Sequence, residues 1–102
     1  MPNHVALITG GAKGIGRAIA LDLAAQGWSV AICYRTSAAA AEETSAAIIA
    51  RGGLALAVQC DVSDPDAAKR VVSQVEERWE KIDALINGAG PYHRVNLFDE
   101  TT

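Results

Sequence analysis

The chain alternates between two patterns of apolar and polar positions. Short apolar runs, many of them with β-branched residues, are typical of strands buried on both faces of a parallel sheet. They cover residues 5–8, 28–34, 54–60 and 82–87. Between them lie segments with helical periodicity: one that follows the first run and stops at Gly27, one over 36–51 and one over 63–80. Strands and helices joined by short links predict an α/β fold with right-handed crossovers.

Each predicted helix has an apolar face that is expected to pack on the sheet. These faces are Ile15, Ile19 and Leu23 in the first helix, Ala41, Ile48 and Ile49 in the second, and Ala68, Val72, Val75 and Trp79 in the third. We expect the third helix to begin with Ser63 as its N-cap, Pro65 in its first turn and Asp66 three residues after the cap. The pattern after Tyr92 is weak, and Asn96 is interpreted as the start of a further helix.

The predicted elements make up part of a Rossmann-like, doubly wound parallel sheet, with about four strands in the order 3-2-1-4 and three helices. Such a sheet binds its ligand at the carboxyl ends of the strands, at the switch point between the first and fourth strands. The motifs that carry candidate chemistry, at 10–16, 34–35, 61–62 and 87–90, each follow a predicted strand. This placement indicates a nucleotide site.

The first motif is a glycine turn formed by Gly10, Gly14 and Gly16. A helix that opens from such a turn presents free N–H groups and the positive end of its dipole, which together hold a phosphate or pyrophosphate. The alternative is a glycine-rich connector with no ligand. The spacing differs from G-x-G-x-x-G, and a P-loop is excluded because Arg17 and Ala18 stand where Lys and Ser or Thr are required.

The end of the second strand indicates which dinucleotide is bound. An NAD site carries an acid about 20 residues beyond the glycine turn, where it bonds the ribose 2′-hydroxyl. Here the strand ends in Tyr34 and Arg35. A guanidinium suits a 2′-phosphate, and Lys13 can reach the same region. These two cations favour NADP(H) over NAD(H), and the alternative is that Arg35 is a solvated loop charge.

Asp61 follows the third strand, and the residues alone leave open whether it binds a ligand or caps the following loop or helix. A phosphorylated receiver domain is excluded, because its Mg²⁺ site also needs acids after the first strand. Thr9, Gly10 and Gly11 occupy that position.

The motif Thr9-Gly10-x-x-x-Gly14-Ile15-Gly16, together with the later strand ends, resembles the short-chain dehydrogenase/reductase family over residues 4–102. The resemblance implies that Asp61 accepts a hydrogen bond from the adenine amino group while Val62 packs on the ring. Asn87-Gly88-Ala89-Gly90 is similar to the family's Asn-Asn-Ala-Gly motif beside the ribose. Gly88 replaces the second Asn, so the hydrogen bonds of that side chain are missing.

The resemblance also supports the cofactor assignment, because family members that prefer NADP(H) carry basic residues at the positions of Lys13 and Arg35. The expected cofactor-binding residues are Gly10, Lys13, Gly14, Ile15, Gly16, Tyr34, Arg35, Asp61, Val62, Asn87, Gly88, Ala89 and Gly90.

The family's activity is hydride transfer between NADP(H) and a small carbonyl or alcohol substrate, with a Ser and a Tyr-x-x-x-Lys as proton-transfer machinery. In this sequence Ala38 stands four positions after Tyr34 and Asn96 stands four after Tyr92, so the motif is absent and no catalytic residue is assigned. Tyr92 and His93 are interpreted as surface residues. We interpret residues 1–102 as the N-terminal part of a dinucleotide-binding domain whose catalytic half lies in a longer, homo-oligomeric reductase. The alternative is a stand-alone, non-catalytic dinucleotide-binding module.

Composition limits the other functions. With 102 residues, 50% of them hydrophobic, and a net charge of −3, the chain is expected to be one globular domain without a nucleic-acid or anionic-membrane surface. It has no signal peptide or membrane span by pattern, which favours the cytoplasm. Cys33 and Cys60 end neighbouring predicted strands and are expected to be buried, reduced thiols rather than a disulfide or a metal site. The fourth strand is expected to be an unpaired sheet edge.

Overall fold

The computed structural model describes residues 4–10, 14–61, 64–87 and 94–97. The elements in chain order are β1 (Val5–Thr9), α1 (Gly14–Ala25), β2 (Ser29–Tyr34), α2 (Ala38–Ala50), β3 (Leu54–Gln59), α3 (Pro65–Trp79), β4 (Ala84–Asn87) and β5 (Arg94–Leu97). The sheet order is β3-β2-β1-β4-β5, and β1 to β4 are parallel. The predicted Rossmann-like α/β fold, with strand order 3-2-1-4 and three helices, is confirmed.

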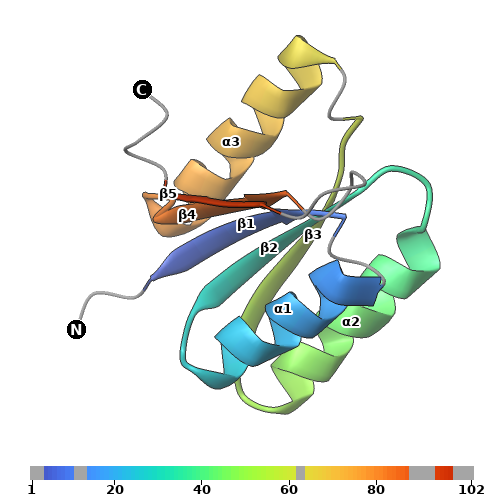
Figure 1. The fold of residues 1–102 in the computed structure, drawn as a ribbon, viewed down its shortest axis with the longest axis vertical. Coiled ribbons are helices and arrows are strands. Elements are labelled where there is room, and N and C mark those ends of the chain that lie inside the picture. The colour runs from blue at the N-terminus through green and yellow to red at the C-terminus, as the bar shows by residue number, and fades with distance from the viewer. Residues whose placement is uncertain (1–3, 11–13, 62–63, 88–93, 98–102) are drawn as a thin grey trace.

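The molecule has three layers, since α1 and α2 cover one face of the sheet and α3 covers the other (Figure 1). Successive residues of a strand point to opposite faces, so each central strand contributes to two buried clusters. The cluster under α1 and α2 includes Ala6, Ile8, Val30 and Ile32, and the cluster under α3 includes Val5, Leu7, Ala31 and Cys33. Burial on both faces explains why the strand sequences are apolar without alternation.

Helix α1 packs on the sheet through small residues. Gly16 and Ala20 are buried, with Ile19 and Leu23 partly buried beside them. The prediction that Ile15 faces the core is wrong, because its side chain is 55% exposed. The small residues that directly follow the glycine turn bring the helix close to the sheet, and Ile15 is turned outward at the end of the helix.

The buried face of α2 is formed by Ala41, Thr44, Ser45 and Ile48. Ile49 was expected on this face, but it is 55% exposed. Adjacent helical positions differ by about 100° around the axis, so a narrow contact that buries Ile48 leaves the next residue outside.

Helix α3 begins one residue later than the sequence predicts. Its N-cap is Asp64 rather than Ser63, because Pro65 takes the first helical position and the Asp64 carboxylate accepts a hydrogen bond from the Asp66 N–H at 3.0 Å. The most buried residues of the helix are Ala67, Val71 and Val75, while the predicted Ala68, Val72 and Trp79 lie at the edge of this stripe and are partly buried.

The tail of the described chain forms a strand. The predicted helix from Asn96 is wrong, since this residue lies in β5, which pairs antiparallel with β4. The expectation of an unpaired edge at β4 is also wrong. The N–H and C=O groups of an open sheet edge are satisfied when the following segment folds back along it.

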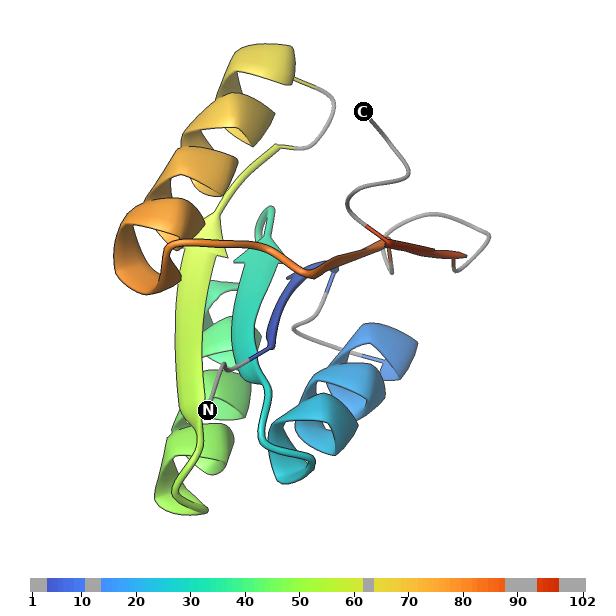
Figure 2. The ribbon, with the colours of Figure 1, turned by 90° about the vertical axis from the view of Figure 1, so that its left-hand side faces the viewer.

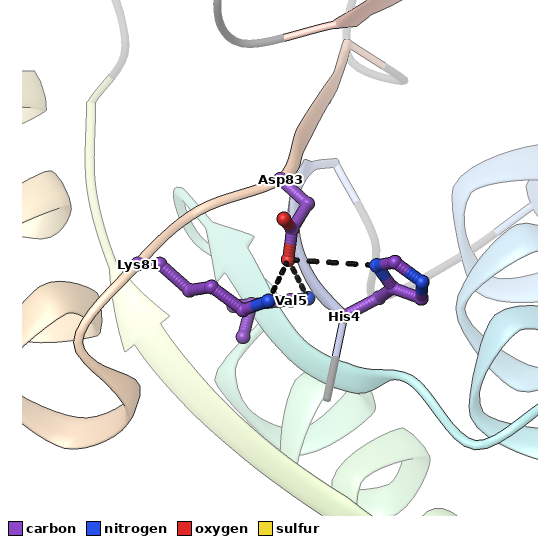
Figure 3. A network of polar contacts seen from close by, with 4 residues as sticks. All are labelled: His4, Val5, Lys81 and Asp83. Atoms are coloured by element: carbon purple, nitrogen blue, oxygen red, sulfur yellow. Dashed lines mark hydrogen bonds and ion pairs between the residues drawn. The ribbon is translucent and has the colours of Figure 1, made fainter. Parts of the chain in front are cut away.

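A carboxylate connects β1 and β4 at the amino ends of the strands (Figure 3). Asp83 Oδ2 accepts a hydrogen bond from the Val5 N–H at 2.7 Å and lies 3.2 Å from Lys81 Nζ and 3.9 Å from His4 Nδ1. The Asp83 N–H donates in return to the Val5 carbonyl at 2.8 Å. The ring of His4 stacks on Trp28, with centroids 4.8 Å apart. This network holds β1 and β4 together at the amino ends of the strands. The predicted site lies at the other end of the sheet.

Candidate functional site

The carboxyl ends of the parallel strands are level with one another at one edge of the sheet. Thr9 at the end of β1 is opposite Cys33 in β2 and Asn87 in β4, and Tyr34 is opposite Gln59. In Figure 2 the arrows of β2 and β3 run side by side toward this edge. The predicted motifs at the ends of β1, β2 and β3 are therefore brought together by the register of the sheet.

A side chain at Gly14, the first residue of α1, would point into open space. Gly10 and Gly14 have φ angles of 69° and 62°, which L side chains rarely adopt. The Gly10 N–H donates to the Cys33 carbonyl at 3.0 Å and so fixes the start of the turn on β2. A Cβ atom added to Gly14 would meet nothing within 4 Å, and the first turn of α1 contains no acidic residue. A helix N-terminus of this kind favours an anion.

Two further predicted site residues are exposed near the carboxyl ends of the strands. Ile15 is exposed beside the turn, where its apolar side chain can cover part of a bound group. Arg35 is also exposed, directly after β2, and its carbonyl accepts a hydrogen bond from Gln59 Nε2 at 3.3 Å, which ties the backbone there to β3. Among the residues that the structure describes, Arg35 forms no ion pair, so its guanidinium is available to an anionic ligand.

Asp61 lies exposed at the end of the β3 segment, and its carbonyl accepts a hydrogen bond from the Asp64 N–H at 3.0 Å. Asp64 is the N-cap of α3, so Asp61 does not cap that helix.

Several predicted site residues lie wholly or partly outside the described residues. Asn87 is described as the last residue of β4, by its backbone only. Lys13, Val62, Gly88, Ala89 and Gly90 lie outside the described residues, as do Tyr92 and His93.

The sequence analysis missed two polar contacts that position the site. Thr9 Oγ1 donates to the Ile86 carbonyl at 3.4 Å and joins β1 to β4 at the switch point. Arg17 Nε donates to Thr44 Oγ1 at 3.1 Å and joins α1 to α2 directly behind the glycine turn. A polar residue at a strand end and a Thr within a helix were the available signals in the sequence, but neither identifies its partner.

Cys33 and Cys60 are buried free thiols, as predicted, at 2% and 5% exposure. Burial, with a smaller contribution from Cys60, raises the pKa of Cys33 to about 12. Neither thiol is poised as a nucleophile at neutral pH.

A cavity of about 420 Å³ lies at the other end of the sheet, between the C-terminal ends of α1 and α2. Its lining includes Leu21, Trp28, Ile48, Arg51 and Leu54. Helix C-termini carry partial negative charge and disfavour phosphates. The electrostatics therefore favour the glycine turn, not this cavity, as the anion site.

Two further observations apply to the described part of the chain. It holds no group of three or more His, Cys, Asp or Glu side chains arranged to bind a metal ion. Its helices are too short or too polar to cross a membrane.

Comparisons with known proteins agree with the fold. Residues 4–102 match the short chain dehydrogenase family, and the chain belongs to this family. It is 44% identical over 87 residues to the 3-oxoacyl-[acyl-carrier-protein] reductase of Synechocystis sp., which covers 85% of this chain and 35% of that protein. Thus the chain spans about a third of the length of the curated relatives it matches.

Solved structures give the same family. A dehydrogenase/reductase from Sinorhizobium meliloti superposes with a TM-score of 0.85 at 35% identity, over 91% of this chain and 37% of that one. The FolM alternative dihydrofolate reductase 1 from Brucella canis, complexed with NADP, superposes with a TM-score of 0.75 at 37% identity, over 82% of this chain and 34% of that one.

Proposed function

We propose that this chain is the NADP(H)-binding N-terminal part of a short-chain dehydrogenase/reductase that transfers hydride between NADP(H) and a small carbonyl or alcohol substrate. The observation that carries the cofactor assignment is the end of β2. An exposed Arg35 stands there without an acid at the position that would bind a 2′-hydroxyl. The NADP-bound relative from Brucella canis supports the same assignment.

The described residues fit such a dinucleotide. The N-terminus of α1 with Gly10, Gly14 and Gly16 would hold the pyrophosphate, because the space in front of Gly14 is open and the helix dipole favours negative charge. Ile15 would cover the cofactor from the side of the turn, and Arg35 would pair with the 2′-phosphate.

We assign the remaining contacts from the same family pattern. Asp61 would accept a hydrogen bond from the adenine amino group, with Tyr34 at the neighbouring strand end. Asn87 would lie beside the nicotinamide ribose at the end of β4. Lys13, Val62 and residues 88–90 would complete the site. The cofactor supplies the hydride, and this chain binds and orients it.

Paired arginine variants test the cofactor assignment. In the protein at its natural length, Arg35→Ala is expected to weaken NADPH binding about 10- to 100-fold, the worth of a charge-assisted contact, and to leave NADH binding nearly unchanged. Arg51→Ala is the matched control, because it removes an exposed arginine at the opposite end of the sheet. If both variants bind NADPH like the unmodified protein, Arg35 does not bind the 2′-phosphate.

A glycine variant tests the pyrophosphate site. Gly14→Asp places a carboxylate in the open space at the helix N-terminus and is expected to abolish binding of both NADPH and NADH. Gly27→Asp is the control, since Gly27 also has a positive φ angle, 96°, and open space around its Cβ position but lies at the far end of α1. Equal cofactor binding by the two variants would refute the pyrophosphate assignment.

A non-catalytic dinucleotide-binding module is the second candidate, favoured by the lack of Tyr-x-x-x-Lys in residues 1–102. The intact mass of the natural protein distinguishes the two. A product well above 10.6 kDa that contains the motif and reduces carbonyl compounds with NADPH supports the reductase. A 10.6 kDa product that binds NADPH without turnover supports the module.

A further inference from the structure

The sheet ends at β3 with an open edge. In the described part of the chain, β3 is the outer strand, with β2 on one side and no strand on the other. Such an edge presents unpaired N–H and C=O groups to a further strand, and proteins usually protect it with charged residues, proline or a bulge. The sequence of β3, Leu-Ala-Leu-Ala-Val-Gln, contains no charged residue and no proline, and its register with β2 is continuous. The edge is therefore unprotected.

The hydrogen bonds to β2 identify the backbone groups that face this edge. The Cys60 N–H, directly after β3, donates to the Tyr34 carbonyl of β2 at 2.8 Å. Successive residues of a strand direct their N–H and C=O groups to alternate sides. The even-numbered residues of β3 therefore point toward β2, and the groups of Ala55, Ala57 and Gln59 point toward the open edge.

The side chains of β3 form two unequal faces. Ala55 and Ala57 pack in the cluster under α1 and α2. Leu54, Leu56 and Val58 project to the opposite face, where Leu54 is 48% exposed and the other two are half-buried. These three residues form an apolar strip beside the unpaired backbone groups, on the face that α3 covers only in part.

The apolar strip is symmetric about Leu56. On either side of this residue stands an alanine, followed by a large apolar residue, Leu54 or Val58. A second copy of β3, antiparallel and related by a two-fold axis at Leu56, would place Leu56 opposite Leu56 and Leu54 opposite Val58. Ala55 would then be opposite Ala57, with their free N–H and C=O groups facing each other. Side chains and hydrogen-bonding groups match in one register, and a shift by one residue would bring the apolar strip against the alanine face.

Helix α3 carries opposite charges along the groove beside this strip. The groove has a volume of about 760 Å³, and the exposed side chains of Arg70, Gln74 and Glu77 line it. Arg70 and Glu77 form no ion pair within the described part of the chain.

The two-fold axis also matches these charges. Helix α3 runs antiparallel to β3 (Figure 2), and β3 and residues 67–78 of the helix have about the same length, roughly 16–17 Å. The middle of the strand is therefore level with the middle of this helical segment, near Gln74. Rotation about the axis exchanges the two ends of the helix, which places Arg70 of one copy level with Glu77 of the other.

We propose that the open edge of β3 is an interface between two copies of this chain, in which β3 pairs antiparallel with β3 of the second copy about a two-fold axis at Leu56. The two sheets become one continuous sheet, with both α3 helices on the same face. The symmetry of the strip and of the charges favours a second copy over a strand from another protein. The interface uses none of the residues assigned to the cofactor and is independent of the proposed function.

Disulfide trapping on the natural-length protein tests the register. The two Leu56 residues form a pair without mutual hydrogen bonds, in which Cα atoms lie about 4.5 Å apart, within the range of a disulfide. Leu56→Cys is therefore expected to form covalent dimers under mild oxidation, above the background of the unmodified protein. Leu54→Cys is the matched control on the same face, because the two substituted residues would be about 13 Å apart along the sheet. Trapping of neither variant, or of both equally, overturns the proposal.

Sedimentation equilibrium measures the association itself. Leu56→Lys buries two ammonium groups opposite each other and is expected to raise the Kd for association at this edge at least about tenfold. Leu56→Ile keeps the apolar surface and should associate like the unmodified protein. If the unmodified protein and Leu56→Lys have the same mass at every concentration, no second copy binds this edge and the proposal is overturned. The trapping result is read independently of whether Leu56→Lys folds.

Charge reversal tests the facing of the two α3 helices. Arg70 and Glu77 are seven positions apart on one helix and do not contact each other within a chain. Arg70→Glu or Glu77→Arg alone should weaken association about two- to fivefold, the worth of exposed ion pairs, and the double variant should restore it. A double variant that associates no better than the single ones overturns this pairing of charges across the axis.

Discussion

Asp83 offers the sharpest test of how the sheet is held together. Its Oδ2 atom is the acceptor for the Val5 N–H at 2.7 Å, and Val5 is 1% exposed at the first position of β1. The same oxygen lies 3.2 Å from Lys81 Nζ (Figure 3). The substitution Asp83→Ala removes the acceptor and the charge together, whereas Asp83→Asn retains a carbonyl acceptor and removes only the charge.

The magnitude follows from the two kinds of contact. A buried N–H that loses its acceptor costs about 1–3 kcal/mol. The ion pair is worth at most about 1 kcal/mol, because the side chains of Lys81 and Asp83 are 37% and 30% exposed and solvent screens them. Asp83→Ala should therefore lower the free energy of unfolding by about 2–3 kcal/mol, and Asp83→Asn by about 1 kcal/mol.

Urea unfolding at constant pH measures these differences, and thermal unfolding provides a second reading. At about 4–8 °C per kcal/mol for a domain near this size, Asp83→Ala should lower Tm by about 10–20 °C. Lys81→Ala is the control for the ion pair and should cost less than about 1 kcal/mol. If Asp83→Ala is no less stable than Lys81→Ala, the hydrogen bond to Val5 does not anchor β1.

Three further predictions concern the backbone and the buried thiol. Glu80 is the C-cap of α3 and has a φ of 71°, a left-handed conformation that strains a residue with a Cβ atom. Glu80→Gly should therefore raise the free energy of unfolding, measured in urea, by about 0.5–1 kcal/mol. No gain of Glu80→Gly over Glu80→Ala would contradict this strain. A Cβ on Gly53 would lie 2.8 Å from Ile48 Cγ2. Gly53→Ala should therefore lower the free energy of unfolding by about 1–3 kcal/mol. An unchanged urea midpoint would show that the Ile48 side chain moves aside at no cost. The pKa of Cys33 is raised from 9.0 to about 12. The folded state therefore holds a proton that the unfolded state loses, and the stability from this thiol is intact below pH 9 and lost as pH rises toward 12. Unfolding measured over this range should have a shallower pH slope in Cys33→Ala, and identical slopes would rule out the linkage.

The topology could be predicted because the apolar periodicity and the glycine turn both indicate the same doubly wound α/β fold. Runs such as 5–8 are buried on both faces, and the register then places Thr9, Cys33 and Asn87 level at one edge. The strand order followed from the doubly wound dinucleotide fold that the alternation of strands and helices indicates. For these strands, the local apolar pattern and the packing of the folded protein favour the same structure.

The misses occurred where a side chain's environment depends on neighbours distant in sequence. Ile15 and Ile49 have helical spacing, but the small residues Gly16 and Ala20 and the narrow contact around Ile48 decide which positions are covered. The strand Arg94–Leu97 forms because it pairs with the outer side of β4. No local sequence pattern predicts that pairing. In the candidate site, Ile15 and Arg35 were selected from the sequence as cofactor-binding residues. The exposure of their side chains depends on tertiary packing and could not be predicted from the sequence.

The most direct test of the central claim is an equilibrium titration of the reduced, natural-length protein with NADPH and, separately, with NADH. A guanidinium that pairs with a 2′-phosphate should make NADPH at least about tenfold the tighter ligand. This preference should shrink in Arg35→Ala and persist in Arg51→Ala. NADH binding as tightly as NADPH, or binding of neither, would contradict the assignment of this edge of the sheet as an NADP(H) site.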